Sequence, residues 1–260
     1  MEKVHVVATH AGQYHIDELL AINFLKEFTN WDIEIIRLSN PEQIPRDAIA
    51  IDFGFGELDH HQEENVPCYI DGTKYCAANL VVAKYGLNYM MESGLSKEYA
   101  ELAINQLQDD LKPIALTDNY GSVKYANTLS SWVACLNGIY NFNEAMAIIQ
   151  PFVISKLIKI KESFGVIAKN NLLALRDPIV VTDDKIPMQY YNKEVKFIVG
   201  YGGREKYNVV STNAQDHPVV ATIGEKGCSF VHSERFLAAF DTLEQAKYCA
   251  AVSFIASQQI

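Results

Sequence analysis

The sequence predicts an α/β protein in which a parallel sheet flanked by helices precedes a smaller α+β region. Short apolar strands at about residues 3–8, 32–39 and 48–52 are interrupted by a helical pattern at about 17–28. From about residue 177 the pattern changes to short β runs separated by Gly, Asn and Asp turns, with one helix at the end. Apolar strands mixed with helices are typical of a doubly wound parallel sheet, whereas grouped strands with a terminal helix are typical of α+β folds.

The early elements each have a local reason. Valines at alternate and adjacent positions predict the strand at 3–8, and alternation favours the strand at 32–39. Two prolines then break the chain before the apolar run at 48–52, which ends at the carboxylate of Asp52.

Helices are expected next. Apolar residues at helical spacing predict a helix at about 74–85, with Gly86 as its stop. A second helix is predicted at about 96–116, and it leads into a turn that carries Asp118. A third helical pattern covers about 127–138.

The remaining elements form the end of the chain. Residues 143–175 have a helical pattern, which Pro151 should kink or split. The last helix, at about 243–257, begins after Thr242 or Asp241, either of which is a suitable cap. The β runs before it are expected at residues 179–181, 195–199, 207–210 and 219–223.

Composition limits the class of protein and its partners. The chain has 260 residues and a formal net charge of −10, which disfavours long duplex nucleic acid because affinity for a duplex comes from neutralising its phosphates. Five scattered cysteines without a CxxC pair are typical of reduced thiols, so we expect a cytoplasmic protein. We also expect no signal peptide and no membrane span.

The densest group of chemically active side chains lies at residues 9–18. His10, His15, Asp17 and Glu18 follow the first strand and precede the first helix, where side chains can converge on a site. Histidine with carboxylate is a ligand set for Mn²⁺ or Zn²⁺. The alternative is an ordinary helix start at which an acid complements the helix dipole.

A second group follows the third strand. Glycines at 54 and 56 allow a tight loop, after which come Asp59, His60 and His61. Four of the seven histidines of the chain lie in these two loops. Ligands bind beyond the carboxyl ends of the strands of a parallel sheet, so both loops are expected at one site. Adjacent histidines on a solvated surface are the alternative, and Asp118 taken alone is more typical of a turn.

Together these motifs resemble a known family. The pattern from Thr9 to Glu18, then Asp52 with Gly54, then the run from Asp59 to Gln62, and finally Asp118-Asn119 is similar to the MYG1 (UPF0160) family, which is allied to the DHH phosphoesterases. The likeness extends to Cys76-Ala77-Ala78 and to the segment from Gly227 to His232.

The resemblance implies an architecture and a metal centre. It implies a DHH-like metal-binding catalytic domain, a helical linker and a smaller DHHA1-like substrate-binding domain, with a cleft between the domains; we place them at residues 1–145, 146–176 and 177–260. Two divalent ions are implied, most simply Mn²⁺, although the extra histidine leaves Zn²⁺ and Fe²⁺ open. Mg²⁺ is a further alternative. The implied metal ligands are His10, His15, Asp17, Asp52, His60 and Asp118.

The implied roles differ from residue to residue. His10 and His15 would ligate one ion, Asp17 and His60 the other, and Asp52 would bridge the two. Asp118 would complete a shell, Asp59 would orient a ligand or ligate weakly, and His61 would contact the substrate phosphate. The residues implied to be catalytic are His61, Asp52 and Asp59. Small residues at Cys76 and Ala77 stand where the family's serines are expected, which removes any hydroxyl there.

Two residues of the second domain are candidates for substrate binding. Arg204 follows Gly202-Gly203 and is a candidate phosphate clamp, and His232 resembles part of the glycine-rich binding segment of DHHA1 domains. For both, an ordinary surface or structural role is the alternative.

The function implied is a metal-dependent phosphoesterase that acts on short oligonucleotides, as a 3′-to-5′ RNA exonuclease does. A small-molecule phosphohydrolase for pyrophosphate, a cyclic dinucleotide or a related nucleotide is the first alternative. A catalytically silent metal-binding or interaction protein is the second. The sequence leaves open whether the chain forms a homo-oligomer.

Overall fold

The chain folds into two compact units, and each is described by itself. The computed structural model describes residues 4–61, 66–121, 129–184 and 188–258. The first unit is Met1–Phe164 and the second is Gly165–Ile260.

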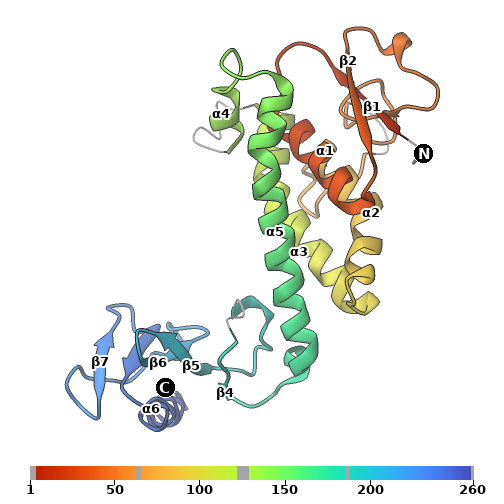
Figure 1. The fold of residues 1–260 in the computed structure, drawn as a ribbon. Helices are drawn as coiled ribbons and strands as arrows, with labels where there is room; N and C mark the ends of the chain where they lie inside the picture. The colour runs from red at the N-terminus through yellow and green to blue at the C-terminus, as the bar shows by residue number, and fades with distance from the viewer. Residues whose placement is uncertain (1–3, 62–65, 122–128, 185–187, 259–260) are drawn as a thin grey trace. The chain divides into compact units, whose positions relative to one another are not determined.

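The first unit contains a three-stranded parallel sheet. The strand order is β2-β1-β3, with β1 (His5–His10) in the centre, β2 (Ile33–Leu38) on one side and β3 (Ile49–Ala50) on the other. Figure 1 shows β1 beside β2. All pairings are parallel, and Ala8 of β1 pairs with Ala50 of β3. The carboxyl ends of β1 and β3 therefore lie at the same edge of the sheet, as predicted.

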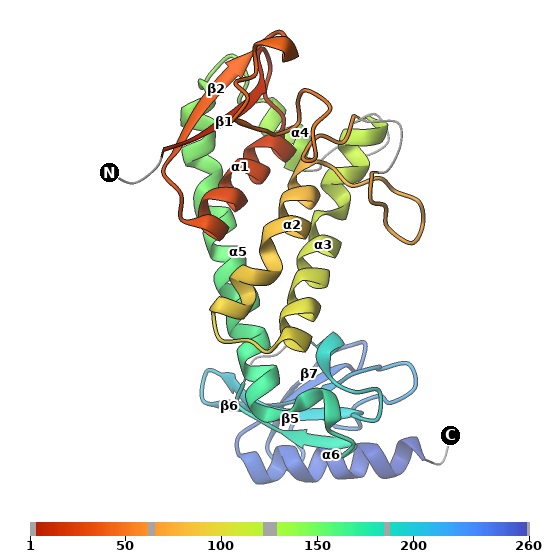
Figure 2. The ribbon, with the colours of Figure 1, turned by 90° about the vertical axis from the view of Figure 1, so that its right-hand side faces the viewer.

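The helices of the first unit pack against one another. Nearly every residue of α1 is buried, because the helix packs against α2 and α3, which lie beside it (Figure 2). The short 3₁₀ turn Pro41–Gln43 separates β2 from β3. The helices that begin in this unit are α1 (Ile16–Thr29), α2 (Ala77–Glu92), α3 (Lys97–Tyr120), α4 (Leu129–Ala134) and α5 (Phe142–Asn170).

Three details of the helices differ from the sequence prediction. Gly86 does not stop α2, which continues to Glu92; a Cβ at Gly86 would lie 2.6 Å from Cδ1 of Ile104, so the glycine permits close packing against α3. Asp118 lies in the last turn of α3 and not in a loop. Pro151 does not split α5, because buried residues on either side of it hold the helix in place. Residues 127 and 128 of the predicted third helix lie outside the described residues.

The second unit is a five-stranded sheet with one long helix. Its strand order is β4-β5-β6-β8-β7, in which only the β4–β5 pair is parallel. The helix α6 (Leu243–Ser257) packs on the sheet, and Thr242 caps it through a bond from the Gln245 backbone N–H. The strands are β4 (Ile179–Val181), β5 (Phe197–Gly203), β6 (Lys206–Ser211), β7 (Cys228–Val231) and β8 (Leu237–Phe240). Short 3₁₀ turns lie at Leu172–Ala174 and Met188–Tyr190.

One predicted strand in this unit is wrong. Residues 219–223 form no ladder: the Val219 N–H donates to the Arg235 carbonyl, and the Val220 N–H donates to the Ser253 hydroxyl on α6. Val219 is nevertheless buried in the core, which explains its apolar character. The ladder is completed by β7 and β8, which the sequence prediction missed.

The predicted mixed α/β class, with a parallel sheet and helices, is confirmed. Among the described residues, no helix combines the length and apolar character that a membrane crossing requires. All five cysteines carry free thiols.

Two glycines offer a matched test of the second unit. A Cβ at Gly200 of β5 would lie 1.9 Å from the Thr182 carbonyl oxygen, whereas a Cβ at Gly165 of α5 meets no atom within 4 Å. We expect Gly200→Ala to destabilise this unit by about 1–3 kcal/mol, as overpacking does. Gly165→Ala should stabilise the helix by about 0.5–1 kcal/mol.

Hydrogen exchange measured by mass spectrometry would check this pair. Peptides from β4 and β5 should exchange faster in Gly200→Ala than in the parent protein, and no faster in Gly165→Ala. Unchanged exchange in Gly200→Ala would mean that the two strands are not held as closely as described.

Candidate metal centre

The eight candidate residues of the first unit meet in one place. His10 ends β1, His15 caps the N-terminus of α1, and Asp17 lies in its first turn. Asp52 directly follows β3 and its isolated bridge, and the loop beyond it carries Asp59, His60 and His61. Asp118 reaches the same place from the last turn of α3.

Several of these side chains lie close enough together to bind the same ion. His10 Nε2 is 3.5 Å from Asp52 Oδ2, and His60 Nδ1 is 3.2 Å from Asp52 Oδ1. His60 Nε2 lies 2.8 Å from Asp118 Oδ2. Three overlapping sets of ligand atoms each fall within 4.8 Å of one another, and they share members: Asp52, Asp59, His60 and His61; His10, His15 and Asp52; and His15, Asp17 and Asp118.

Asp52 occupies the centre of this arrangement. It contacts a histidine from each of the two loops, and its side chain is almost fully buried. Its backbone is in the left-handed region, with φ of 55°, which costs roughly 1–2 kcal/mol for a residue with a Cβ. The Asp52 N–H donates to the Leu58 carbonyl, and this bond fixes the turn. Strain of this kind is common where a fold positions a functional side chain.

We call these eight residues the cluster. Several of its buried polar atoms lack hydrogen-bond partners. Within the described residues, both carboxylate oxygens of Asp17 and of Asp52, together with His60 Nδ1 and Asp118 Oδ2, have none of acceptable geometry. Buried polar groups are normally satisfied, so each such atom needs an explanation. These are oxygen and imidazole donors, so the residues fit a divalent cation.

Burial and like charge act together on Asp17. Its side chain is fully buried, which raises its pKa well above the ordinary value, and the neighbouring Asp52 and Asp118 raise it further. A bound cation would reverse this effect, because it favours the charged carboxylate. The same groups therefore favour either a proton or a metal ion.

His10 is oriented for coordination through one nitrogen. Its Nδ1 lies 3.1 Å from the Ala11 carbonyl, which leaves Nε2 directed toward the cluster. The Asp52 carboxylate raises the pKa of His10 to about 9 and outweighs the opposing effect of burial. Because a ligating imidazole is neutral, metal and proton compete for this site.

Glu18 has a different environment from Asp17. Its Oε2 accepts a hydrogen bond from the Thr9 hydroxyl at 2.6 Å, and its Oε1 accepts one from the His15 N–H at 3.0 Å. Arg37 lies 3.4 Å from Glu18 Oε1 and donates to the Gly12 carbonyl. Glu18 thus ties the first loop to β1 and β2. Glu18 was expected among the site residues of the first loop or as an acid that complements the helix dipole, and its position three residues after His15 is the spacing of a capping box.

Asp59 and the partly exposed His61 lie at the solvent side of the cluster. Asp59 accepts hydrogen bonds from the Phe55 N–H and from the N–H and Nδ1 of His61, the last at 2.6 Å. Burial raises the pKa of Asp59, but these hydrogen bonds outweigh it and lower the pKa below its usual value. The hydrogen bond to Asp59 raises the pKa of His61, whose ring is 55% exposed and stacks on His60.

A buried network beside the cluster was not predicted. Asn79 Nδ2 donates to Gln108 Oε1 at 2.6 Å and to the Tyr69 hydroxyl at 2.8 Å, and Gln108 Nε2 donates to the Asn79 carbonyl. These bonds hold the start of α2 against α3 and so help to place Asp118. Cys76 caps α2 here, and burial raises the pKa of its thiol well above the ordinary value.

Arg204 and His232 lie in the second unit and at opposite ends of its sheet. Arg204 is in the tight β5–β6 turn, with φ of 51°. His232 follows β7, and its N–H donates to Leu237 at the start of β8. The antiparallel register from β5 through β6 and β8 to β7 separates the two turns by about one strand length. One phosphate therefore does not reach both side chains, and the substrate-binding role of each remains a prediction.

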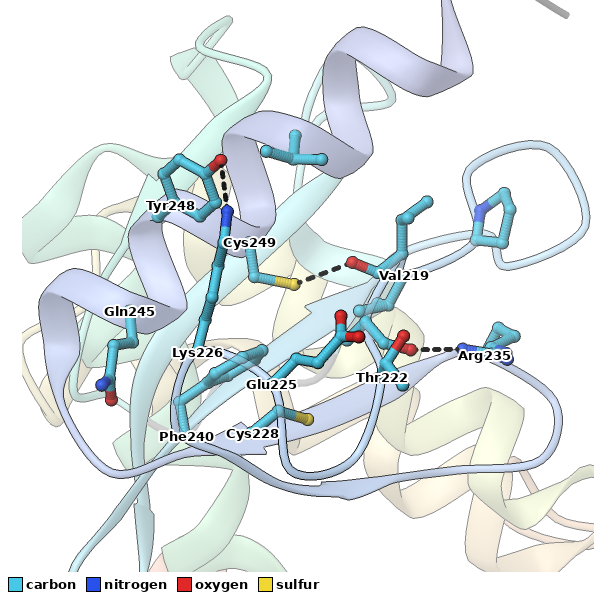
Figure 3. Close-up of a pocket in the computed structure, with 14 residues that line it drawn as sticks. Val219, Thr222, Glu225, Lys226, Cys228, Arg235, Phe240, Gln245, Tyr248 and Cys249 are labelled. Carbon is cyan, nitrogen blue, oxygen red and sulfur yellow. Dashed lines mark hydrogen bonds between the residues drawn. The ribbon is translucent and has the colours of Figure 1, made fainter.

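The second unit also contains a cavity of about 540 Å³ between α6 and the segment 218–226 (Figure 3). Lys226 Nζ donates to the Tyr248 hydroxyl at its edge, and Arg235 donates to the Ala221 carbonyl. Cys228, Phe240 and Cys249 supply apolar lining. Neither Arg204 nor His232 lines this cavity, and it holds no group of acids and histidines like that of the first unit.

The fold and the cluster define an α/β protein with a buried centre of histidines and carboxylates, and comparison with known proteins identifies its family. The MYG1_exonuc model, described as "Uncharacterised protein family (UPF0160)", matches residues 6–151, more than half of the chain. The chain belongs to this family.

Several curated proteins are similar to this chain. "MYG1 exonuclease" of Homo sapiens is 28% identical over 187 residues, which cover 58% of this chain and 50% of that protein. The Mus musculus protein of the same name is 29% identical over 191 residues, with 58% and 49% covered. "MYG1 protein" of Dictyostelium discoideum is 30% identical over 115 residues, with 40% and 35% covered. The chain spans about half the length of the two mammalian relatives.

The first prediction from this site concerns Asp17. Because its folded pKa is raised above the ordinary 3.8, its contribution to the stability of the metal-free protein is full below that value and is lost as pH rises through the folded pKa. Asp17→Asn should remove this loss, which amounts to at most about 1.4 kcal/mol per pH unit for one proton. The variant should also bind Mn²⁺ more weakly.

Urea unfolding in EDTA at several pH values would measure the first effect, and titration calorimetry the second. Asp47→Asn, at an exposed turn, serves as the control and should behave like the parent protein. Parental Mn²⁺ affinity in Asp17→Asn would remove Asp17 from the ligand set.

The second prediction concerns the pair of Asp59 and His61. Asp59→Asn removes the charge that holds the His61 proton, so the pKa of His61 should fall toward the ordinary value of 6.5. NMR titration of the His61 ring in the metal-free protein would measure this shift. Asp71→Asn, at an exposed ion pair with Lys112, is the control. A His61 pKa that does not move would assign the effect to Asp52 and Asp118 instead.

Proposed function

We propose that this protein is a divalent-metal-dependent phosphodiesterase of the DHH type that hydrolyses short oligonucleotides as an exonuclease. The observation that carries the proposal is the buried cluster in which, among the described residues, Asp17 and Asp52 have no hydrogen-bond donor of acceptable geometry and lie beside imidazole groups. The mammalian relatives are named as exonucleases, which supports the same reaction class. In this proposal the second unit is the DHHA1-like substrate-binding domain.

The proposed ligands divide between two ions. His10 and His15 would hold one, Asp17 and His60 the other, and Asp52 would bridge them because a carboxylate has two oxygens to offer. Asp118 would complete the shell beside His60. Two divalent ions, which we propose to be Mn²⁺, would supply an activated water and charge stabilisation for attack on phosphorus.

His61 is the proposed catalytic group outside the ligand set. Its ring is partly exposed, and Asp59 fixes its orientation through Nδ1. Because Nδ1 contacts the Asp59 carboxylate, Nε2 is the nitrogen of a protonated His61 ring that could donate to a phosphoryl oxygen as charge develops there. Asp59 acts as its positioning residue and not as a ligand.

The charge of the chain favours short substrates. A net charge of −10 opposes a long polyanion, whereas a short oligonucleotide needs only a local site. A small-molecule phosphohydrolase uses the same centre, so pyrophosphate and a cyclic dinucleotide belong in the same assay.

The test compares substrates and variants together. With Mn²⁺, the protein should shorten labelled RNA oligomers stepwise, and EDTA should stop it. Asp52→Ala should lose both bound metal and activity, because the bridge between the two ligand groups is gone. His61→Ala should retain metal, by elemental analysis, while turnover falls by about 10²–10³-fold, the range for loss of one donor that stabilises developing charge.

Each alternative has its own signature in this assay. Turnover of pyrophosphate or a cyclic dinucleotide without RNA cleavage would support the small-molecule phosphohydrolase. Bound metal without turnover of any phosphoester would support a silent metal-binding protein. Loss of metal in His61→Ala would make His61 a ligand.

A further inference from the structure

A cavity in the first unit lies directly beside the candidate metal ligands. It has a volume of about 500 Å³, within the range of small-ligand sites, and His15 and Asp118 form part of its wall. The remaining wall comes from the loop before α1, from the last turns of α3, and from α4 with the turn after it; these residues are Gln13, Tyr14, Ile16, Thr117, Ser130, Ser131, Ala134 and Asn137.

The charged residues of this wall indicate which kind of chemical group the cavity can bind. None of its ten residues is a lysine or an arginine, and its charged members are the two that also belong to the cluster. Among the described residues, the wall offers no lysine or arginine to neutralise a second phosphate, which would face the Asp118 carboxylate. The cavity therefore suits a neutral polar group attached to a phosphate that lies at the cluster.

Hydrogen bonds between Tyr14 and Asn137 hold part of the wall in place. Asn137 accepts from the Tyr14 N–H and donates to the Tyr14 carbonyl, both at 3.0 Å. The Tyr14 hydroxyl donates to the Tyr140 carbonyl. These bonds join the loop before α1 to the turn after α4, so the two sides of the cavity keep a fixed separation.

Ser130 is different from these residues. Its Oγ is buried, and within the described residues it has no hydrogen-bond partner. A hydroxyl can both donate and accept, so it can pair with a sugar hydroxyl or with the edge of a base. A buried hydroxyl in the wall of a cavity without a partner is explained if the partner belongs to the ligand.

We propose that this cavity binds the neutral nucleoside next to the reacting phosphate, and that Ser130 Oγ is the hydroxyl that recognises it. The inference rests on the proposed function for the position of the phosphate. It narrows the substrate class to nucleotide phosphodiesters and places pyrophosphate among poor substrates. Recognition of the nucleoside then lies within the first unit.

The test begins with adenosine, a neutral nucleoside, and the metal-free protein. Adenosine should shift the backbone NMR signals of residues that line the cavity, and Ser130→Ala should weaken its binding about 2- to 10-fold, the range for one neutral hydrogen bond. Ala134→Leu, which fills part of the cavity, should weaken it further. Ser93→Ala is the control, because Ser93 follows the C-terminal end of α2 and its hydroxyl donates to the Met90 carbonyl.

With Mn²⁺ present, the ratio of Michaelis constants gives a second measurement. Ser130→Ala should raise the Michaelis constant for an adenylyl dinucleotide relative to that for bis(p-nitrophenyl) phosphate, which has no nucleoside. Adenosine binding that shifts other residues, or that is equal in Ser130→Ala and Ser93→Ala, would overturn the inference. Binding that depends on Ser130 without turnover of any phosphoester would support the nucleoside site and reject the proposed phosphodiesterase.

Discussion

The cost of burying carboxylates without donors is the constraint on which the first unit depends. Asp17 and Asp52 are removed from water, and within the described residues neither has a hydrogen-bond donor of acceptable geometry nor a lysine or arginine at ion-pair distance. An isolated buried charge is strongly unfavourable, so such groups are protonated or paired with a cation. The surrounding histidines and Asp118 make a divalent ion the partner that satisfies all of these groups at once.

Two adjacent acids, Asp17 and Glu18, differ in whether the protein itself supplies their hydrogen-bond partners. Glu18 follows Asp17 and is equally buried, yet it accepts bonds from Thr9 and His15 and lies beside Arg37. The Arg37 guanidinium also stacks 4.3 Å above the ring of Phe142 at the start of α5. Glu18 is therefore satisfied by the protein, whereas Asp17 is left for a ligand. This difference in partners separates a scaffold carboxylate from a candidate metal ligand within a single turn of helix.

The sequence predicted the loops of the centre well because the chemistry there is local. His10, His15 and Asp17 follow one strand, and Asp52 to His61 follow another, so parallel pairing of β1 with β3 brings them together. The position of Asp118 in a helix was not foreseen, because the turn-like composition after it hid the last turn of α3. The role of Glu18 was missed since it depends on Arg37, a contact across 19 positions. The position of Gly86 depends in the same way on packing against Ile104, which no local pattern records.

The second unit shows the limit of the same approach. Val219 has the apolar character of a strand residue, but it is buried beneath α6 and its backbone bonds lie outside the ladder. β7 and β8 have only four residues each, too few for a clear alternation. Short elements of this kind are stabilised by tertiary packing and not by local preference, so composition alone does not find them.

The distribution of chemistry between the units favours the first as the site of both catalysis and nucleoside recognition. The family match at residues 6–151 lies entirely within it, together with every candidate metal ligand and the neutral cavity beside His15 and Asp118. In the second unit, Arg204 and His232 are separated by the length of the sheet, so at most one of them can contact a given phosphate. In the reaction proposed above, the terminal nucleotide would be recognised beside the candidate metal ligands of the first unit, where the cavity wall has no lysine or arginine among its described residues.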